Sequence, residues 1–223
     1  MSRSEQKLPP FTVLIEWENA IDVEDEWTAR AMVAFQSELE RCRDLLSGRP
    51  KVMYLYNANA VQEDTILNVI DRVAPKLREL ADLELVPTPG LTYYQLKNFG
   101  AQRAQTDIVI MLDSDAGPQP GWLPGLLKPF ADQEIEAVGG FTVLGYEDLL
   151  SRTMALIWIF NLASEREITV QRKKIHANNC AMRTEFFRSN PFPELPAFKK
   201  QCGIWLRDID RRGVRWTRTA DAM

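Results

Sequence analysis

The segment that most restricts the fold of this chain is an almost wholly apolar run, Asp107–Leu112, which ends directly at the acidic triplet Asp113-Ser114-Asp115. Short runs rich in Ile and Val that end in a polar turn are typical of strands. Since both alternating sets of its side chains are apolar, this strand has to be covered on both faces, as the central strands of parallel sheets are. The segment therefore predicts a sheet with helices on both sides.

Strand-like and helix-like segments alternate through the first half of the chain. A strand followed by a helix, repeated, is the pattern of a parallel sheet with crossover helices. We therefore predict an α/β protein with a Rossmann-like, mostly parallel central sheet flanked by helices. The strands are expected at Phe11–Ile15, Lys51–Tyr56, Leu83–Gly90 (strand and turn) and Asp107–Leu112, and the helices at residues 24–46, around Ile66–Val73 before Pro75, and at Tyr93–Gln105.

The second half is less regular, and 223 residues suit one domain of this class. A strand is expected near Ala137–Leu144, a helix over Glu147–Ala163, and a last helix over Ile204–Arg212, closed by Gly213. Residues 1–10 are expected to form a flexible leader, which leaves residues 11–223 as the domain.

Composition excludes several classes of protein. The longest apolar stretch, Met154–Phe160, has seven residues, far below the ~20 that span a bilayer, and we expect it to pack in the core. The start of the chain is polar and does not resemble a signal peptide. Three cysteines without a Cys-x-x-Cys pair suit the reducing cytoplasm and exclude a thiolate zinc site. With His176 the one histidine, carboxylates must hold any metal, which favours Mg²⁺ or Mn²⁺.

Charge is distributed unevenly along the chain. Residues 1–165 have a balance of −11, whereas residues 166–223 carry 13 basic and 6 acidic side chains, a balance of +7. The cationic part suits a phosphorylated substrate, an anionic membrane surface at the inner face of the membrane, or the acidic part of the same molecule. No basic stripe studded with aromatic residues accompanies it, so nucleic acid is not an expected partner.

Ligands of open parallel sheets bind beyond the carboxyl ends of the strands, so the residues that follow each strand are the candidates for a site. These are Glu16–Ala20, Asn57–Ala60 and Asp113–Trp122. The last contains Asp113 and Asp115, two carboxylates that can coordinate a divalent cation and so neutralise a diphosphate. The other Asp-x-Asp pair, Asp208 and Asp210, falls inside the last predicted helix and is interpreted as a solvated face.

Four segments in this order resemble the catalytic domain of family 2 glycosyltransferases, which has the GT-A fold. The most specific segment is QLKNFGAQRAQTDIVIMLDSDAGPQPGWL, where the family has an Arg-Asn-x-Gly helix, a strand, an Asp-x-Asp motif and a Pro-x-Trp-Leu turn. The others are FTVLIEWENA, ANNCAMRTEFF and IWLRDIDRRGVRW, at Phe11–Ala20, Ala177–Phe187 and Ile204–Trp216.

The resemblance implies a hexosyltransferase-like enzyme that uses a nucleotide diphosphate-sugar, with UDP the favoured nucleotide and a glycan, a lipid-linked compound or a small molecule as acceptor. It also implies roles for residues at matching positions. Asp115 would bind the metal, and Asp113 would approach the metal or the ribose. The nucleotide would contact Glu16, Glu18, Lys97 (at the family's Arg position) and Asn98, whose part is structural in an alternative interpretation.

Two positions depart from the family pattern. Asn57 stands where the family usually has an Asp that contacts the base, and its amide offers a donor as well as an acceptor. Gln201 and Cys202 stand just before the last helix, where the family usually shows Glu-Asp, one of which is the general base. Glu194, in a Pro-rich loop, is the candidate replacement; Asp208 is expected to pack or pair instead.

Two questions stay open from the sequence: whether the domain is complete at its C-terminus, and whether it is an enzyme. The chain ends earlier than resembling domains usually do, so some C-terminal residues of the domain are expected to be missing. Loss of the usual base leaves a nucleotide-sugar-binding module without transferase activity as the main alternative to an enzyme. A phosphatase with Asp113 as nucleophile is the weakest interpretation, because that class has its Asp-x-Asp after the first strand.

Overall fold

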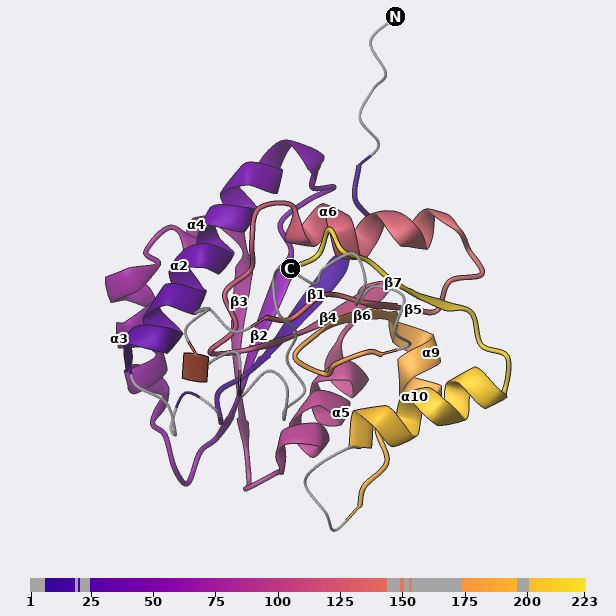
Figure 1. Cartoon of the computed structure of the whole chain (residues 1–223). Coiled ribbons are helices and arrows are strands. Elements are labelled where there is room, and N and C mark those ends of the chain that lie inside the picture. The colour runs from indigo at the N-terminus through magenta and orange to yellow at the C-terminus, as the bar shows by residue number, and fades with distance from the viewer. Residues whose placement is uncertain are drawn as a thin grey trace, which may run out of the picture.

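The structure, a computed structural model, describes residues 7–18, 20, 25–143, 149, 150, 153, 174–195 and 201–223. It confirms an α/β domain with a central seven-stranded sheet (Figure 1). The strands are β1 (Phe11–Glu16), β2 (Lys51–Asn57), β3 (Asp82–Thr88), β4 (Ile108–Asp113), β5 (Ala137–Gly139), β6 (Asn179–Arg183) and β7 (Trp216–Arg218). The helices in the described ranges are α2 (Asp25–Cys42), α3 (Glu63–Val73), α4 (Leu77–Leu80), α5 (Tyr93–Arg103), α6 (Trp122–Leu127), α9 (Thr184–Ser189) and α10 (Gln201–Arg211), with 3-10 turns η1 (Arg43–Leu45) and η2 (Lys128–Ala131).

The strand order across the sheet is β3-β2-β1-β4-β6-β5-β7. The pairs β1·β2, β1·β4, β2·β3 and β5·β7 are parallel, whereas β6 runs antiparallel to both β4 and β5. The start of β6 therefore lies at the same edge of the sheet as the carboxyl ends of the parallel strands. All seven strands thus bring loop residues to one edge.

Two hydrophobic clusters cover the two faces of the sheet. Figure 1 shows α2, α3 and α4 on one side and α5, α9 and α10 on the other. Alternate residues of each strand supply the two clusters: Ile110 and Leu112 belong to the cluster under α2 and α6, whereas Val109 and Met111 belong to the cluster under α5. The doubly apolar pattern of β4 is explained by this arrangement.

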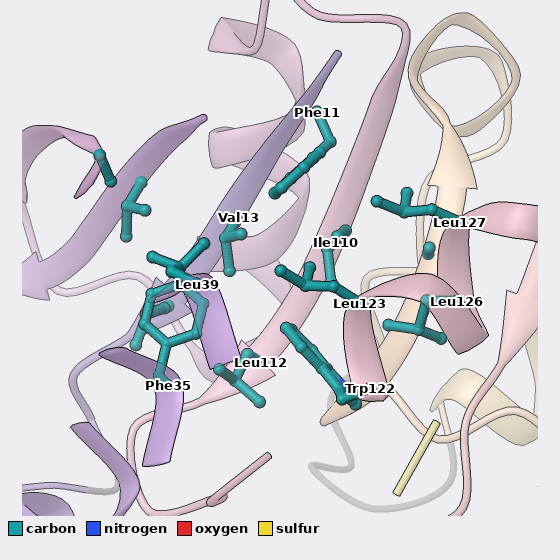
Figure 2. Close-up of a cluster of buried hydrophobic side chains, with 14 of the residues drawn as sticks. Phe11, Val13, Phe35, Leu39, Ile110, Leu112, Trp122, Leu123, Leu126 and Leu127 are labelled. Carbon is teal, nitrogen blue, oxygen red and sulfur yellow. The ribbon is translucent and has the colours of Figure 1, made fainter. Parts of the chain in front are cut away.

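The cluster under α2 is formed mainly by large side chains from α2 and α6. Figure 2 shows Phe35 and Leu39 of α2 and Trp122 of α6 packed against Val13 and Leu112 of the sheet. The Phe35 and Trp122 rings meet edge to face with centroids 6.2 Å apart. The α2 stripe predicted from the sequence is therefore the core-facing side of that helix.

The predictions for the first half of the chain are confirmed to within a few residues. The second half differs: β5 is only three residues long, because Phe141 N–H already donates to Ala222 O (2.7 Å) and the chain has left the ladder. Elements β6, β7, α6 and α9 were not predicted. Within the expected helix Glu147–Ala163 only residues 149, 150 and 153 are described, and they are helical; Met154–Phe160 lies outside the described residues.

The ordered domain begins before Phe11, earlier than the predicted end of the leader. Leu8 is buried, and its N–H donates to Leu45 O at 2.8 Å. Lys7 Nζ donates to Asp44 O at 2.6 Å. Residues 7–10 therefore pack on the domain, while residues 1–6 lie outside the described residues. In the described part of the chain, no helix has the length and apolar character needed to cross a membrane.

Candidate functional site

Two acidic side chains meet at the carboxyl edge because of strand register. Glu16 ends β1 and Asp113 ends β4, and the parallel pairing places them directly opposite each other. Leu14 and Met111, two residues earlier on each strand, point toward α5, so the period of two directs Glu16 and Asp113 to the same side. Both acids are buried, Glu16 completely and Asp113 to 7% exposure.

Asp113 is held by two residues one helical turn apart on α5. Lys97 Nζ lies 2.7 Å from Asp113 Oδ1, and the Tyr93 hydroxyl donates to the same carboxylate at 2.8 Å. Tyr93 and Lys97 are four residues apart, so they share one face of the helix. The Lys97 ammonium also lies 4.3 Å from the centroid of the Tyr93 ring. Asp113 is thus held in orientation by an ion pair with Lys97 and by a hydrogen bond from the uncharged Tyr93 hydroxyl.

Tyr93 is suited to be a permanent donor to Asp113. Burial raises the pKa of the Tyr93 hydroxyl well above its ordinary value, and the negative charges of Asp113 and Glu16 raise it further. The phenol therefore keeps its proton over the whole working range of pH. Tyr93 was not predicted from the sequence; its spacing of four residues from Lys97 was the available signal.

The turn after β4 carries Asp115, the predicted metal ligand. Asp115 is half-buried, and the turn is closed by the Ala116 N–H, which donates to Asp113 O at 3.1 Å. The far end of this loop is fixed by Glu38 of α2, a completely buried side chain that was also missed. Its carboxylate accepts from Gly121 N (3.1 Å) and Leu123 N (3.0 Å), at the N-terminus of α6.

Residues at the ends of β1 and β2 form the adjoining part of this edge. Glu16 Oε2 accepts from the backbone N–H of Glu18 at 2.8 Å, which folds the turn after β1 back on the strand. The half-buried Asn57 accepts from Asn59 N at 3.0 Å through its side-chain oxygen. Glu16, Glu18 and Asn57 thus lie at or just after the carboxyl ends of two adjacent parallel strands.

Asn98 and Gly100, the other two residues of the α5 motif, fix the helix to its neighbours. Asn98 makes a two-way pair with the backbone of Phe192: its Nδ2 donates to Phe192 O (2.9 Å), and its Oδ1 accepts from Phe192 N (3.0 Å). These bonds occupy the amide, in agreement with the alternative, structural interpretation of Asn98. A Cβ on Gly100 would lie 2.7 Å from Leu55 Cδ1, so this glycine lets α5 approach the sheet.

Glu194 lies close to the two positions at which the usual base is replaced. It is exposed, and its Oε2 accepts from Gln95 Nε2 in the first turn of α5 (3.3 Å). Gln201 Nε2 donates to the backbone carbonyl of Leu195, the residue that follows Glu194, at 3.2 Å. Contrary to the prediction, Gln201 and Cys202 do not precede the last helix; they form its first turn. Gln201 is buried and Cys202 packs against the cluster under α5, so both side chains belong to the inner side of the helix.

The second Asp-x-Asp pair and the three cysteines are the other residues that the sequence brought into consideration. Asp208 forms an i,i+4 ion pair with Arg212 (3.2 Å), and Asp210 accepts from Trp216 Nε1 (3.2 Å). The last helix therefore uses this Asp-x-Asp pair for local contacts. All three cysteines are free: Cys42 and Cys180 are buried, and Cys202 is half-buried.

Asn179 joins two of the segments that carry the family resemblance. Its Oδ1 accepts from Trp122 Nε1 at 2.9 Å, and its Nδ2 donates to Ala222 O at 3.2 Å. A Cβ on Gly140 would lie 2.3 Å from Asn179 Oδ1, so the glycine makes room for the amide. The Asn of the β6 segment thus connects β6, the Pro-x-Trp turn and the C-terminal residues.

The donor set at this edge suits Mg²⁺ or Mn²⁺ shared with a substrate diphosphate. In the part of the chain that the structure describes, no group of three or more His, Cys, Asp or Glu side chains could hold a metal alone. A divalent cation of this kind is commonly bound by one or two carboxylates together with substrate phosphates. Asp115 and Asp113 are such a pair of carboxylates, and Asp113 is also bound by Lys97 and Tyr93.

The family model for glycosyl transferase family 2 matches residues 70–192, more than half of the chain. The chain therefore belongs to glycosyl transferase family 2. No curated protein is significantly similar to it in sequence.

Solved structures of GT-A glycosyltransferases share the fold. One is a mannosyltransferase from Pyrobaculum calidifontis in complex with GDP-Man and Mn²⁺ (TM-score 0.64, 20% identity, 100% of this chain and 58% of that chain). Others are glucosyl-3-phosphoglycerate synthase from Mycobacterium tuberculosis with Mn²⁺, UDP and glucosyl-3-phosphoglycerate (0.56, 17%, 94% and 69%) and mannosyl-3-phosphoglycerate synthase from Rubrobacter xylanophilus (0.58, 13%, 94% and 64%). The chain thus spans 58–69% of the length of these proteins.

Proposed function

We propose that this chain transfers a sugar from a nucleotide diphosphate-sugar to an acceptor hydroxyl, with a UDP-sugar as the favoured donor, a divalent metal as cofactor and inversion at the anomeric carbon. The observation that carries the proposal is the buried Asp113 carboxylate, which Lys97 and Tyr93 orient at the carboxyl edge next to Glu16. Family membership and the order of the motifs support it.

The donor nucleotide would lie over the ends of β1, β2 and β4. Glu16, Glu18 and Asn57 would hydrogen-bond the base and ribose, and Asp113, held in place by Lys97 and Tyr93, would accept from the ribose hydroxyls. Preorganised polar groups of this kind cost no reorganisation when the substrate binds.

Asp115 would hold Mg²⁺ or Mn²⁺ on the diphosphate, where the bound cation neutralises the charge of the leaving nucleoside diphosphate. Glu38 supports this arrangement from outside the site, because it fixes the end of the loop that carries Asp115.

Glu194 is the proposed general base. In a single displacement the acceptor oxygen bonds to the anomeric carbon, the bond from that carbon to the diphosphate oxygen breaks, and the base removes the acceptor proton. Gln201 does not titrate and Cys202 is a thiol, whereas Glu194 is an exposed carboxylate on the adjoining loop.

Replacement of Glu194 tests this assignment. Glu194→Gln is expected to lower kcat by about 10²-fold or more while nucleotide affinity stays the same. Glu185→Gln is the matched control, since Glu185 is an exposed carboxylate that pairs with Arg188 on α9. Full turnover by Glu194→Gln would exclude Glu194 as the base.

Binding of donor nucleotides tests the proposal as a whole. We would titrate UDP, GDP, CDP and dTDP calorimetrically, with and without Mn²⁺, into the wild type and Asp115→Ala. The expected result is metal-dependent binding of UDP that Asp115→Ala loses. Preference for GDP would correct the nucleotide, and absence of binding to any nucleotide by folded protein would contradict the proposal.

The alternative, a nucleotide-sugar-binding module without transferase activity, is motivated by the Gln201-Cys202 pair at the usual base position. It expects the same nucleotide binding but no turnover with any donor and acceptor. Hydrolysis of the donor in the absence of an acceptor, abolished by Asp115→Ala, would exclude it.

A further inference from the structure

The turn that follows β2 is built around Asn57, the last residue of that strand. The backbone carbonyl of Asn57 accepts from Ala60 N at 2.9 Å and from Val61 N at 3.0 Å. Its side-chain Oδ1 accepts from Asn59 N at 3.0 Å. Three N–H groups of one turn therefore converge on the two oxygens of this residue, and they fix its side chain as well as its backbone.

These bonds determine which end of the Asn57 amide is presented to a ligand. Only the oxygen of a side-chain amide accepts from an N–H, so the bond from Asn59 N directs Oδ1 into the turn and Nδ2 away from it. Among the residues that the structure describes, Asn57 Nδ2 has no hydrogen-bond partner. Asn57 therefore offers a ligand its two N–H donors, while its side-chain oxygen is already engaged.

Gly90 leaves the amide nitrogen uncovered on one side. This exposed glycine belongs to the turn after β3, the strand next to β2, and has φ +66°. A Cβ on Gly90 would lie 4.0 Å from Asn57 Nδ2, so a side chain at this position would pack on the amide. Glycine thus satisfies the positive φ of the turn and keeps Nδ2 accessible.

The place of Asn57 along the sheet edge assigns it to one end of the proposed nucleotide. Asp115, the proposed metal ligand, follows β4, and β1 lies between β4 and β2. Asn57 is therefore two strands away from β4, roughly 10 Å at ~4.8 Å per strand. With the diphosphate on the metal at Asp115, the ribose lies over β1, and the base, which is the end of the nucleotide farthest from the diphosphate, reaches β2.

We propose that Asn57 determines the choice of base: its Nδ2 donates to the exocyclic carbonyl at position 4 of a pyrimidine and so selects uracil over cytosine. This inference rests on the proposed function for the presence of a donor nucleotide. At position 4 uracil has a carbonyl oxygen, which accepts, whereas cytosine has an amino group, which donates. Cytosine would therefore place two donors against each other. A site built to hydrogen-bond one group rejects the analogue that leaves its polar atoms unpaired.

Asn57→Asp is the direct test, because it exchanges a donor for an acceptor with almost no change in size. One carboxylate oxygen still accepts from Asn59 N, and the other faces the base. We would measure the Kd of UDP and of CDP, each with Mn²⁺, by calorimetric titration of the full chain. The wild type is expected to bind UDP about tenfold or more tightly than CDP, and Asn57→Asp is expected to lower this preference by about tenfold or more.

Asn59→Asp is the matched control. It adds the same negative charge two residues away, on an exposed side chain. Repulsion between the added charge and the diphosphate weakens UDP and CDP alike, so the ratio of their Kd values should stay that of the wild type.

Tighter binding of CDP than of UDP by the wild type would overturn the proposal, and so would a UDP preference that Asn57→Asp leaves unchanged. Either result, obtained with measurable nucleotide binding, contradicts this inference and leaves the proposed function standing. Absence of binding of any nucleotide by folded wild type would contradict both. If Asn57→Asp does not fold, Asn57→Ser decides, because its hydroxyl oxygen still accepts from Asn59 N while the amide donor is removed, and the preference for UDP should then disappear.

Discussion

Lys97 Nζ lies 2.7 Å from Asp113 Oδ1, and this ion pair is buried, with the two side chains 0% and 9% exposed. It crosses from α5 to the end of β4, so one contact both fixes the helix on the sheet and orients the first acid of the Asp-x-Asp motif. Charges buried in this way are costly to separate, since removal of one partner leaves the other uncompensated. The pair therefore links stability of the fold to geometry of the site.

Lys97→Met is expected to lower the free energy of unfolding by about 3–5 kcal/mol, because Asp113 would stay buried without its cation. Lys51→Met is the control with the same substitution, since Lys51 pairs with Glu84 at the surface, and it should cost less than about 1 kcal/mol. Urea denaturation measures both. Equal losses would contradict the argument that burial of the Lys97 pair distinguishes it.

Tyr93→Phe removes the hydroxyl that donates to Asp113 and is expected to cost about 1–3 kcal/mol of stability. We also expect weaker nucleotide binding, because Asp113 loses a group that orients it. Tyr54→Phe is the matched control: the Tyr54 hydroxyl is buried and has no hydrogen-bond partner among the described residues. That variant should be as stable as the wild type or more stable.

Because the pKa of His176 is lowered in the folded chain, we expect the protein to lose stability in mild acid. The pKa of the ring is about 4 in the folded chain against an ordinary value of 6.5, since burial and the charges of Arg218 and Lys174 disfavour the protonated ring. Above pH 6.5 neither state binds the proton; as the pH falls from 6.5 to 4 the unfolded state binds it first, and stability drops by up to about 3 kcal/mol. Unfolding of His176→Gln should depend less on pH across this window. Identical profiles for wild type and variant would contradict the shift.

The elements that could be predicted from the sequence are those whose hydrophobic pattern lies within one short segment. The apolar β4 and the amphipathic α2 follow from periodicity, and the site edge follows from the rule for open sheets. The antiparallel β6 and the three-residue β7 could not be predicted, because their pairing depends on partners distant in the sequence. Glu38 was missed for the same reason: nothing near it indicates that its carboxylate binds the N-terminus of α6.

Substitution of Glu38 tests whether a residue that does not contact the proposed metal ligand still affects metal-dependent binding, by holding the loop that contains Asp115. Its carboxylate accepts from Gly121 N and Leu123 N, so it caps α6 and holds the end of the loop that contains Asp115. Glu38→Gln keeps the size but weakens both bonds, and we expect a loss of about 1–3 kcal/mol together with weaker Mn²⁺-dependent nucleotide binding. Glu40→Gln, on the exposed side of the same helix in a 3.1 Å pair with Lys76, is the control and should change neither quantity appreciably. Calorimetric titration at a temperature where the variant is fully folded separates the two effects: unchanged affinity there would limit Glu38 to a role in stability alone.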